Sequence, residues 1–257
     1  MAPRTSSFDA VVLHGREGPS GIRIVTLLSP EAGLVDAFVF GGGKSKLRSL
    51  ASPWNAGRAW IYRDSARELV KLSDFDATES FPGVREDLRR IWAASFAAEC
   101  LMRTDSGGGE HAAGYELFVD ALSALREAEG DRVDYAAVQF AWRLAALLGV
   151  KPGTRECARC GRAFAPGEAL RLSSEEGFLC APCAEASGRE GGLARAPELG
   201  AGAARYLEST ESLPFREALR AGVEARSLAA LKLVAFELAA AACEGPLRSV
   251  QTGSGIL

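Results

Sequence analysis

Histidine is scarce in this sequence, because only His14 and His111 occur among 257 residues. Neither belongs to the His-x-Glu pattern of a zinc deaminase or the His-Glu-x-x-His pattern of a metalloprotease. A clustered set of acidic and basic residues, which a hydrolase needs, is also missing. The sequence therefore predicts a binding protein and not an enzyme. An undetected hydrolase is the alternative, which turnover screening would reveal.

Long apolar runs are absent as well. The longest candidate, Leu228 to Cys243, is interrupted by Lys232 and Glu237, whereas a membrane span needs roughly 18 uncharged apolar residues. Near the start, Ala10 to Leu13 is too short for the apolar region of a signal peptide. We therefore expect a cytoplasmic protein without membrane spans. In that reducing compartment the six cysteines are not expected to form disulfides.

Overall positive charge is lacking too, since the net charge is −3. The distribution is uneven, however. Between Phe40 and Leu72 there are seven basic residues and two acidic ones, so this window is +5 and the rest of the chain is −8. The basic residues are Lys44, Lys46, Arg48, Arg58, Arg63, Arg67 and Lys71. A local basic patch is what a protein needs to dock a polyanion such as a nucleic acid.

Short strands are predicted for the first 80 residues. Runs rich in β-branched and aromatic residues are separated by Gly, Pro and Ser, as at Gly41-Gly42-Gly43. The runs are Ala10–Leu13, Ile22–Leu28, Leu34–Phe40, Arg58–Tyr62 and Leu69–Leu72. Short strands without long helices between most of them favour a small barrel of the OB-fold kind. Some other small sheet is the alternative.

After Phe81-Pro82-Gly83 the apolar period changes from two to about 3.6, which is typical of helices. Apolar stripes run from Leu88 to Cys100, from Tyr115 to Leu125, from Val138 to Leu148 and along a last long helix from Glu224 to Cys243. Two short helices are expected on either side of Pro214, and Gln251–Leu257 is expected to be a frayed tail. We interpret the stripes as the core of a helical domain.

Four cysteines form the pattern Cys157-x2-Cys160 and Cys180-x2-Cys183, separated by 19 residues. This spacing is typical of a zinc site, because two Cys-x-x-Cys turns supply four thiolates to a tetrahedral ion. The spacer resembles a hairpin, Ala169–Ser173 and Gly177–Leu179, which would return the second pair to the first. Four thiolates leave no position for a catalytic water, so the predicted zinc is structural. A redox dithiol pair or a site that has lost its metal is the alternative.

The segment Gly43-Lys44-Ser45 resembles the end of a nucleotide-binding loop, but Phe38 stands where the first glycine should be. Leu47 to Pro53 is also too short for the helix that such a loop requires. We interpret the segment as a Gly-rich turn followed by alternate cations Lys44, Lys46 and Arg48, which lie along a phosphate backbone. Trp54, Trp60 and Tyr62 are candidate stacking surfaces. The alternative is a solvated basic loop beside ordinary core aromatics.

The order of these features resembles the bacterial recombination mediator family RecO. The resemblance rests on four segments: Ile24–Gly33, Phe40–Arg48, Leu148–Pro152 leading into Cys157–Gly161, and Gly245–Ser249. It implies an α+β chain with an N-terminal OB-fold β-barrel and a C-terminal α-helical domain that carries an inserted four-cysteine zinc ribbon. The expected boundaries are 1–80 for the barrel, 81–153 and 188–250 for the helical domain, and 154–187 for the zinc element.

The resemblance also implies a non-catalytic role in recombinational DNA repair. Such proteins bind single- and double-stranded DNA, anneal complementary strands coated by single-strand-binding protein, and act with RecR to load RecA. The expected DNA contacts are Lys44, Lys46 and Arg48, with Arg23 and Arg58 as weaker candidates that would otherwise be ordinary surface partners on strands. The alternative is a zinc-ribbon accessory factor of transcription or translation that binds nucleic acid without annealing it.

Overall fold

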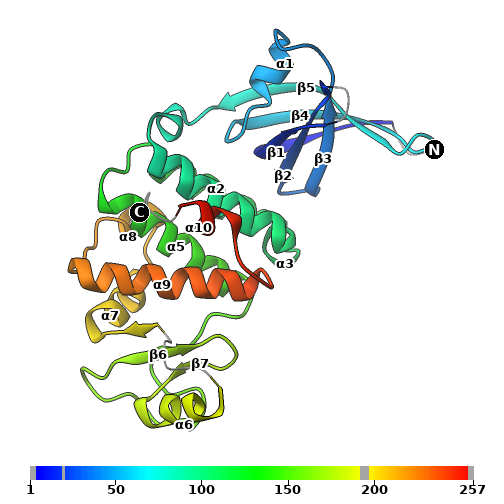
Figure 1. Ribbon diagram of the computed structural model, residues 1–257. Coiled ribbons are helices and arrows are strands. Elements are labelled where there is room, and N and C mark those ends of the chain that lie inside the picture. The colour runs from blue at the N-terminus through cyan, green and yellow to red at the C-terminus, as the bar shows by residue number, and fades with distance from the viewer. Residues whose placement is uncertain (1–3, 19–20, 192–196, 254–257) are drawn as a thin grey trace. The chain divides into compact units, whose positions relative to one another are not determined.

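A computed structural model describes residues 4–18, 21–191 and 197–253 (Figure 1). The chain forms two compact units, Met1–Glu127 and Ala128–Leu257. Within the described residues, no helix is both long and apolar enough to cross a membrane. The three-part division predicted from the sequence, with boundaries at 80, 153 and 187, stays a prediction beside this two-unit division.

The first unit begins with a closed barrel of five strands in the order β1-β2-β3-β5-β4. The strands are β1 (Thr5–Glu17), β2 (Arg23–Ser29), β3 (Gly33–Val39), β4 (Ala56–Asp64) and β5 (Leu69–Glu79). All neighbours are antiparallel except β3 and β5, and β1 pairs with β4 to close the barrel. The predicted barrel is therefore confirmed, although β1 and β5 are longer than the apolar runs that predicted them.

Alternation along the strands builds the barrel core. On β3, Val35, Ala37 and Val39 point into the core, so Phe38 lies on the outer surface. Helix α1 (Lys46–Leu50) packs Leu47 and Leu50 against this core. This short helix agrees with the expectation that Leu47 to Pro53 is too short for the helix of a nucleotide-binding loop. A helix of five residues is not stable alone, and partial burial of its two leucines stabilises it here.

Three helices complete the first unit after the 3-10 turn η2 (Pro82–Glu86): α2 (Leu88–Arg103), α3 (Asp105–Gly108) and α4 (His111–Leu125). The Asp87 side chain caps α2 by accepting a hydrogen bond from the backbone N–H of Arg90 at 3.0 Å. The stripes from Leu88 and Tyr115 thus form helices as predicted. Asp105 and Ser106 have φ of +46° and +62°, and these left-handed conformations interrupt the helical backbone between α2 and α4.

In the second unit, the two long helices α5 (Asp131–Leu147) and α9 (Ala225–Ala242) pack together, as Figure 1 shows. The shorter helices are α7 (Ala201–Thr210), α8 (Phe215–Ala218) and α10 (Arg248–Gly253). Helices α7 and α8 lie on either side of Pro214, as predicted. The expected frayed tail was partly wrong, because residues 251–253 belong to α10, and residues 254–257 lie outside the described residues.

The cysteine segment of this unit forms a small sheet in the order β7-β6-β8, followed along the chain from β7 by helix α6 (Ala181–Gly191). Strands β6 (Leu170–Ser173) and β7 (Gly177–Leu179) form the predicted hairpin, with Ser173 opposite Gly177. The sequence did not predict β8 (Glu198–Leu199), because two residues are too few to show an alternation. The hairpin brings the two cysteine pairs to the same place.

Candidate metal centre and nucleic-acid interface

The four cysteine sulfurs of Cys157, Cys160, Cys180 and Cys183 all lie within 4.8 Å of one another. The first pair occupies the turn that the bridge between Glu156 and Ala163 closes, and the second pair lies where β7 ends and α6 begins. The Sγ atoms of Cys160 and Cys180 are 3.9 Å apart. A tetrahedral ion with bonds of about 2.3 Å to sulfur sets its ligands about 3.8 Å apart, so this cluster can hold a metal ion.

The backbone around the cluster has a conformation that favours metal binding by the four cysteines. Gly161 has φ +68°, a conformation that favours glycine, and its N–H donates to the Cys157 carbonyl at 2.9 Å. The N–H of Cys180 donates to the Cys157 Sγ at 3.4 Å. A backbone amide therefore points at a sulfur.

These contacts also set the ionisation of the thiols. Burial raises the pKa of Cys157, but hydrogen bonds from the backbone of Cys160, Cys180 and Arg159 outweigh it and lower the pKa to about 6. The side-chain hydrogen bond with Cys180, followed by burial, raises the pKa of Cys183 to about 12. These contacts thus favour the thiolate form of Cys157 and the thiol form of Cys183. Metal binding at the cluster would release protons from the thiols that bind it.

Two ion pairs reinforce the turns of this element. The Arg159 guanidinium contacts the Glu176 carboxylate, and Arg162 donates to Glu168 at 2.6 and 2.9 Å. The hydrogen bond from Arg162, aided by the N–H of Ala165, lowers the pKa of Glu168 to about 2. Both pairs link residues near the first cysteine pair to the spacer, so they hold the chain on either side of the cluster.

The basic loop, which contains Lys44, Lys46 and Arg48, has two cations without ion pairs among the described residues and one that contacts neighbouring residues. Lys44 and Lys46 are exposed, and neither forms an ion pair with another described residue. Arg48, by contrast, donates to the Glu17 carboxylate at 2.6 Å and to the Gly41 carbonyl at 3.2 Å, and only 15% of its side chain is exposed. Lys46 and Arg48 belong to α1, where residues two apart point in different directions. The loop therefore presents its two lysines to solvent, and Arg48 holds it in place.

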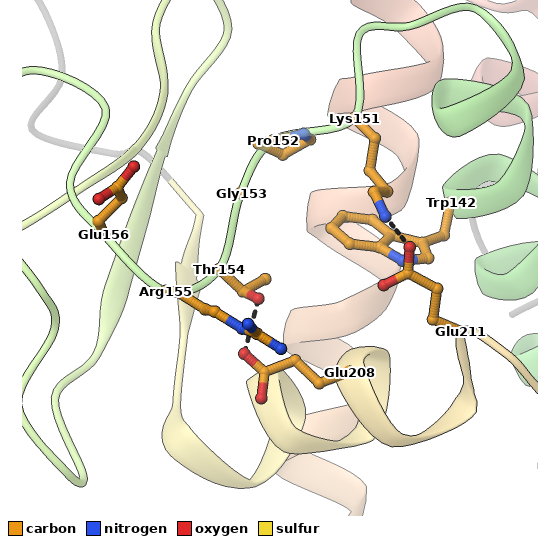
Figure 2. A pocket seen from close by; sticks show the side chains of 9 residues that line it. All are labelled: Trp142, Lys151, Pro152, Gly153, Thr154, Arg155, Glu156, Glu208 and Glu211. Carbon is orange, nitrogen blue, oxygen red and sulfur yellow. Dashed lines mark hydrogen bonds and ion pairs between the residues drawn. The ribbon is translucent and has the colours of Figure 1, made fainter. Parts of the chain in front are cut away.

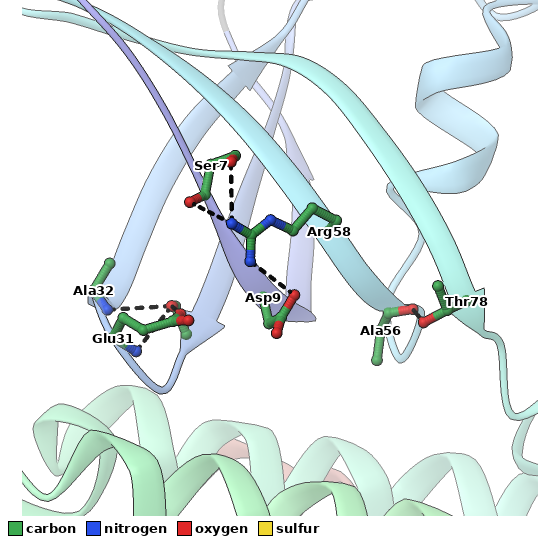
Figure 3. Close-up of polar contacts among 8 residues, drawn as sticks. Ser7, Asp9, Glu31, Ala32, Ala56, Arg58 and Thr78 are labelled. Atoms are coloured by element: carbon green, nitrogen blue, oxygen red, sulfur yellow. Dashed lines mark hydrogen bonds and ion pairs between the residues drawn. The ribbon is translucent and has the colours of Figure 1, made fainter. Parts of the chain in front are cut away.

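The two weaker candidates on the strands, Arg58 and Arg23, are less accessible than the lysines, one through its contacts and the other through burial. Figure 3 shows the Arg58 guanidinium reaching Asp9 at 3.2 Å and the Ser7 carbonyl at 3.1 Å. Arg23 stands on β2 in the same alternation as the core residues Val25 and Leu27, and its Nε is buried. Neither arginine is presented as freely as the two lysines.

The three aromatic candidates differ from one another. Trp54 is only 8% exposed and lies beneath the Arg85 guanidinium, 5.7 Å from the ring centre, so its interpretation as a stacking surface was wrong. Trp60 and Tyr62 are half-buried on the outer face of β4. Two further aromatic residues, Phe38 and Phe40, were not predicted as stacking surfaces, although Phe38 lies on the outer face of β3 and Phe40 follows directly after the strand.

A pocket of about 490 Å³ lies in the second unit beside the segment that leads into the cysteine element (Figure 2). It is lined by Trp142, Lys151, Pro152, Gly153, Thr154, Arg155, Glu156, Glu208 and Glu211. Lys151 pairs with Glu211, and Thr154 donates to Glu208 at 2.7 Å. Two of its three glutamates are therefore engaged by neighbours within the pocket.

Comparison with known proteins finds matches to one protein family over nearly the whole chain. The family model "Recombination protein O N terminal" matches residues 1–81, and "Recombination protein O C terminal" matches residues 85–239. These two matches meet near the end of the barrel. They therefore divide the chain into one part that contains the five strands and one that contains the helices and the cysteine cluster.

Three relatives, each named DNA repair protein RecO, are similar along most of their length. That of Pelotomaculum thermopropionicum is 35% identical over 177 residues, which are 68% of this chain and 67% of the relative. That of Anaeromyxobacter sp. (strain K) is 32% identical over 228 residues, 83% of this chain and 88% of the relative. That of Rubrobacter xylanophilus is 32% identical over 228 residues, which are 85% of this chain and 89% of the relative. With its barrel, helices and cysteine cluster in the matching order, this chain belongs to the RecO family of DNA repair proteins.

Proposed function

We propose that this protein binds single- and double-stranded DNA through its barrel and anneals complementary strands. The strands would include those coated by single-strand-binding protein, and the protein would act with RecR to help load RecA on them. Membership of the RecO family supports this role. We propose that the protein acts in the reducing cytoplasm, where its six free cysteines stay thiols or bind metal. Annealing requires strands held with their bases free to pair and needs no bond chemistry, so we propose no catalytic residue.

The observation that carries this proposal is the pair of exposed lysines Lys44 and Lys46 beside the Gly-rich turn. They lie in a stretch with a local excess of positive charge, +5 between Phe40 and Leu72 in a chain of net −3. Arg48 belongs to the same contact and also fixes the loop through Glu17. Arg23 and Arg58 remain weaker candidates, because the Arg23 Nε is buried and Asp9 engages Arg58.

For the cysteine cluster we propose one structural zinc ion held by Cys157, Cys160, Cys180 and Cys183. Four cysteine sulfurs within 4.8 Å of one another are a donor set that suits zinc. With all four ligands from the protein there is no open position for a reacting water. The ion would therefore stabilise the element and take no part in chemistry.

Annealing tests this proposal against the alternative of an accessory factor that only binds nucleic acid. Two complementary oligonucleotides, each precoated with single-strand-binding protein, are expected to anneal much faster when the protein is added. An accessory factor would bind the strands and leave the annealing rate unchanged. Omitting single-strand-binding protein from a parallel reaction distinguishes annealing itself from displacement of the coat.

A further inference from the structure

The outer face of the barrel carries an aromatic row that crosses three strands. Phe38 on β3 pairs with Lys71 on β5, and Lys71 pairs with Tyr62 on β4. Side chains of directly paired residues lie on the same face of a sheet. The register therefore places one cation between two aromatic residues. Phe40, two residues beyond Phe38, lies on the same face at the end of the row.

Phe40 is the most accessible member of this row. It is 40% exposed, one of few large apolar side chains so open among the described residues. Its ring centre lies 6.3 Å from that of Phe38, and the Lys71 Nζ lies 5.6 Å from the Phe40 ring centre. An aromatic ring held beside a cation on a surface is suited to stack with a nucleobase, while the cation is placed for a phosphate.

The distribution of charge on this outer face favours DNA binding around Lys71 and Phe40 over binding nearer the start of β4. Toward the start of β4, Trp60 is paired with Asp74, and Arg58 is paired with both Asp9 and Asp76. Carboxylates therefore lie beside the outward-facing residues that precede Tyr62 on this strand. Those carboxylates make this part of the face less favourable for a phosphate backbone than the part around Lys71. At the other end, Phe40 is followed directly by Gly41-Gly42-Gly43 and Lys44. The accessible ring and the free lysines are thus continuous in the chain.

We propose that Phe38, Phe40 and Tyr62, arranged around Lys71, form a subsite that stacks unpaired bases of single-stranded DNA. This inference rests on the proposed DNA binding of the barrel and adds a preference between DNA forms. In a duplex each base is already stacked on its neighbours, and no base face is available to Phe40. The subsite therefore contributes to binding of single strands and not to binding of duplexes, whereas the lysines act on both.

The test compares Phe40→Leu, which keeps an apolar side chain but removes the ring, with Phe40→Tyr, which keeps the ring. Affinities are measured for oligo(dT), for an abasic strand of equal length and for a duplex. Phe40→Leu is expected to weaken oligo(dT) binding about tenfold, within the range for loss of one stacked base. The abasic strand and the duplex should bind as before, and Phe40→Tyr should bind oligo(dT) like the original protein.

Salt dependence separates this subsite from the phosphate contacts. Phe40→Leu is expected to leave the slope of log affinity against log salt unchanged, because it removes no cation. Leu233→Ala, at an apolar residue of α9 that is 60% exposed, is the matched control and should leave every affinity unchanged. Thermal melting of each variant verifies folding.

Each outcome decides between the two proposals. If the unaltered protein binds neither DNA form, the proposed function is wrong, and the subsite is wrong with it. If it binds DNA and Phe40→Leu binds oligo(dT) equally well, only the subsite is wrong. A loss that extends equally to the abasic strand would also overturn the subsite, since the ring would then not be in contact with bases.

Discussion

Replacing Cys160 with serine is expected to remove the zinc ion and to unfold residues 155–187 while the barrel stays folded. The buried cluster around the metal site consists of Cys157, Leu179, Cys180 and Ala184, so half of it is ligand. An element of this size is too small to fold without such help. Structural zinc in small fingers contributes about 10–16 kcal/mol at neutral pH, which exceeds or matches the whole stability of a typical domain, about 5–15 kcal/mol.

Metal analysis and hydrogen exchange measure this effect together. The original protein should hold one zinc per chain, and amides of residues 155–187 should lose protection in Cys160→Ser while barrel amides keep theirs. Cys243→Ala is the control, because that buried cysteine lies outside the cluster and its loss should leave the zinc content at one. Far less than one zinc in freshly purified protein, never exposed to chelator, would refute the zinc assignment.

A chain that ends at Pro152 is expected to be poorly soluble or partly molten. Helix α5 buries residues on several faces, and much of that burial is against α9, which such a chain lacks. The lost partners include Leu231 and Leu238, and Lys232, which forms an ion pair at 3.4 Å with the almost fully buried Asp134. Removing α9 therefore exposes a large apolar surface and takes away the Lys232 ammonium that pairs with Asp134.

Thermal melting and light scattering measure this outcome. Residues 153–257 supplied as a separate chain are the matched control, since they restore the same contacts with only one peptide bond missing. Co-expression should recover solubility and a cooperative transition. If the fragment ending at Pro152 melts by itself as cooperatively as the whole protein, the helical domain is not assembled from both sides of the cysteine element.

The parts of the fold that could be predicted are those that local pattern determines. Alternating apolar residues predicted the five strands of the barrel, and a period near 3.6 predicted α2, α4, α5 and α9. The cysteine spacing predicted the cluster, because a metal site needs only two turns and a hairpin between them. These features depend on residues close together in the sequence.

The parts that could not be predicted depend on partners far along the chain. Arg48 is engaged by Glu17, 31 positions away, and Arg58 by Asp9, 49 positions away, so neither is as free as its sequence context suggested. Trp54 is buried beneath Arg85, which also lies well outside its own segment. Helix α1 exists because the barrel accepts its leucines. The exposed Phe40 was within reach of prediction from the alternation of β3.

The central claim is that the loop containing Lys44, Lys46 and Arg48 contacts the DNA backbone. The most direct test is the salt dependence of single-strand affinity for the variant with all three residues changed to alanine. Each phosphate neutralised on a single strand contributes about −0.7 to the slope of log affinity against log salt. The triple variant should flatten the slope by about 2, of which Lys44→Ala with Lys46→Ala should account for about 1.4. Affinity should fall alike for every sequence, because backbone contacts carry no base information. An unchanged slope together with unchanged annealing in the triple variant would contradict the claim and would move the DNA contact away from this loop.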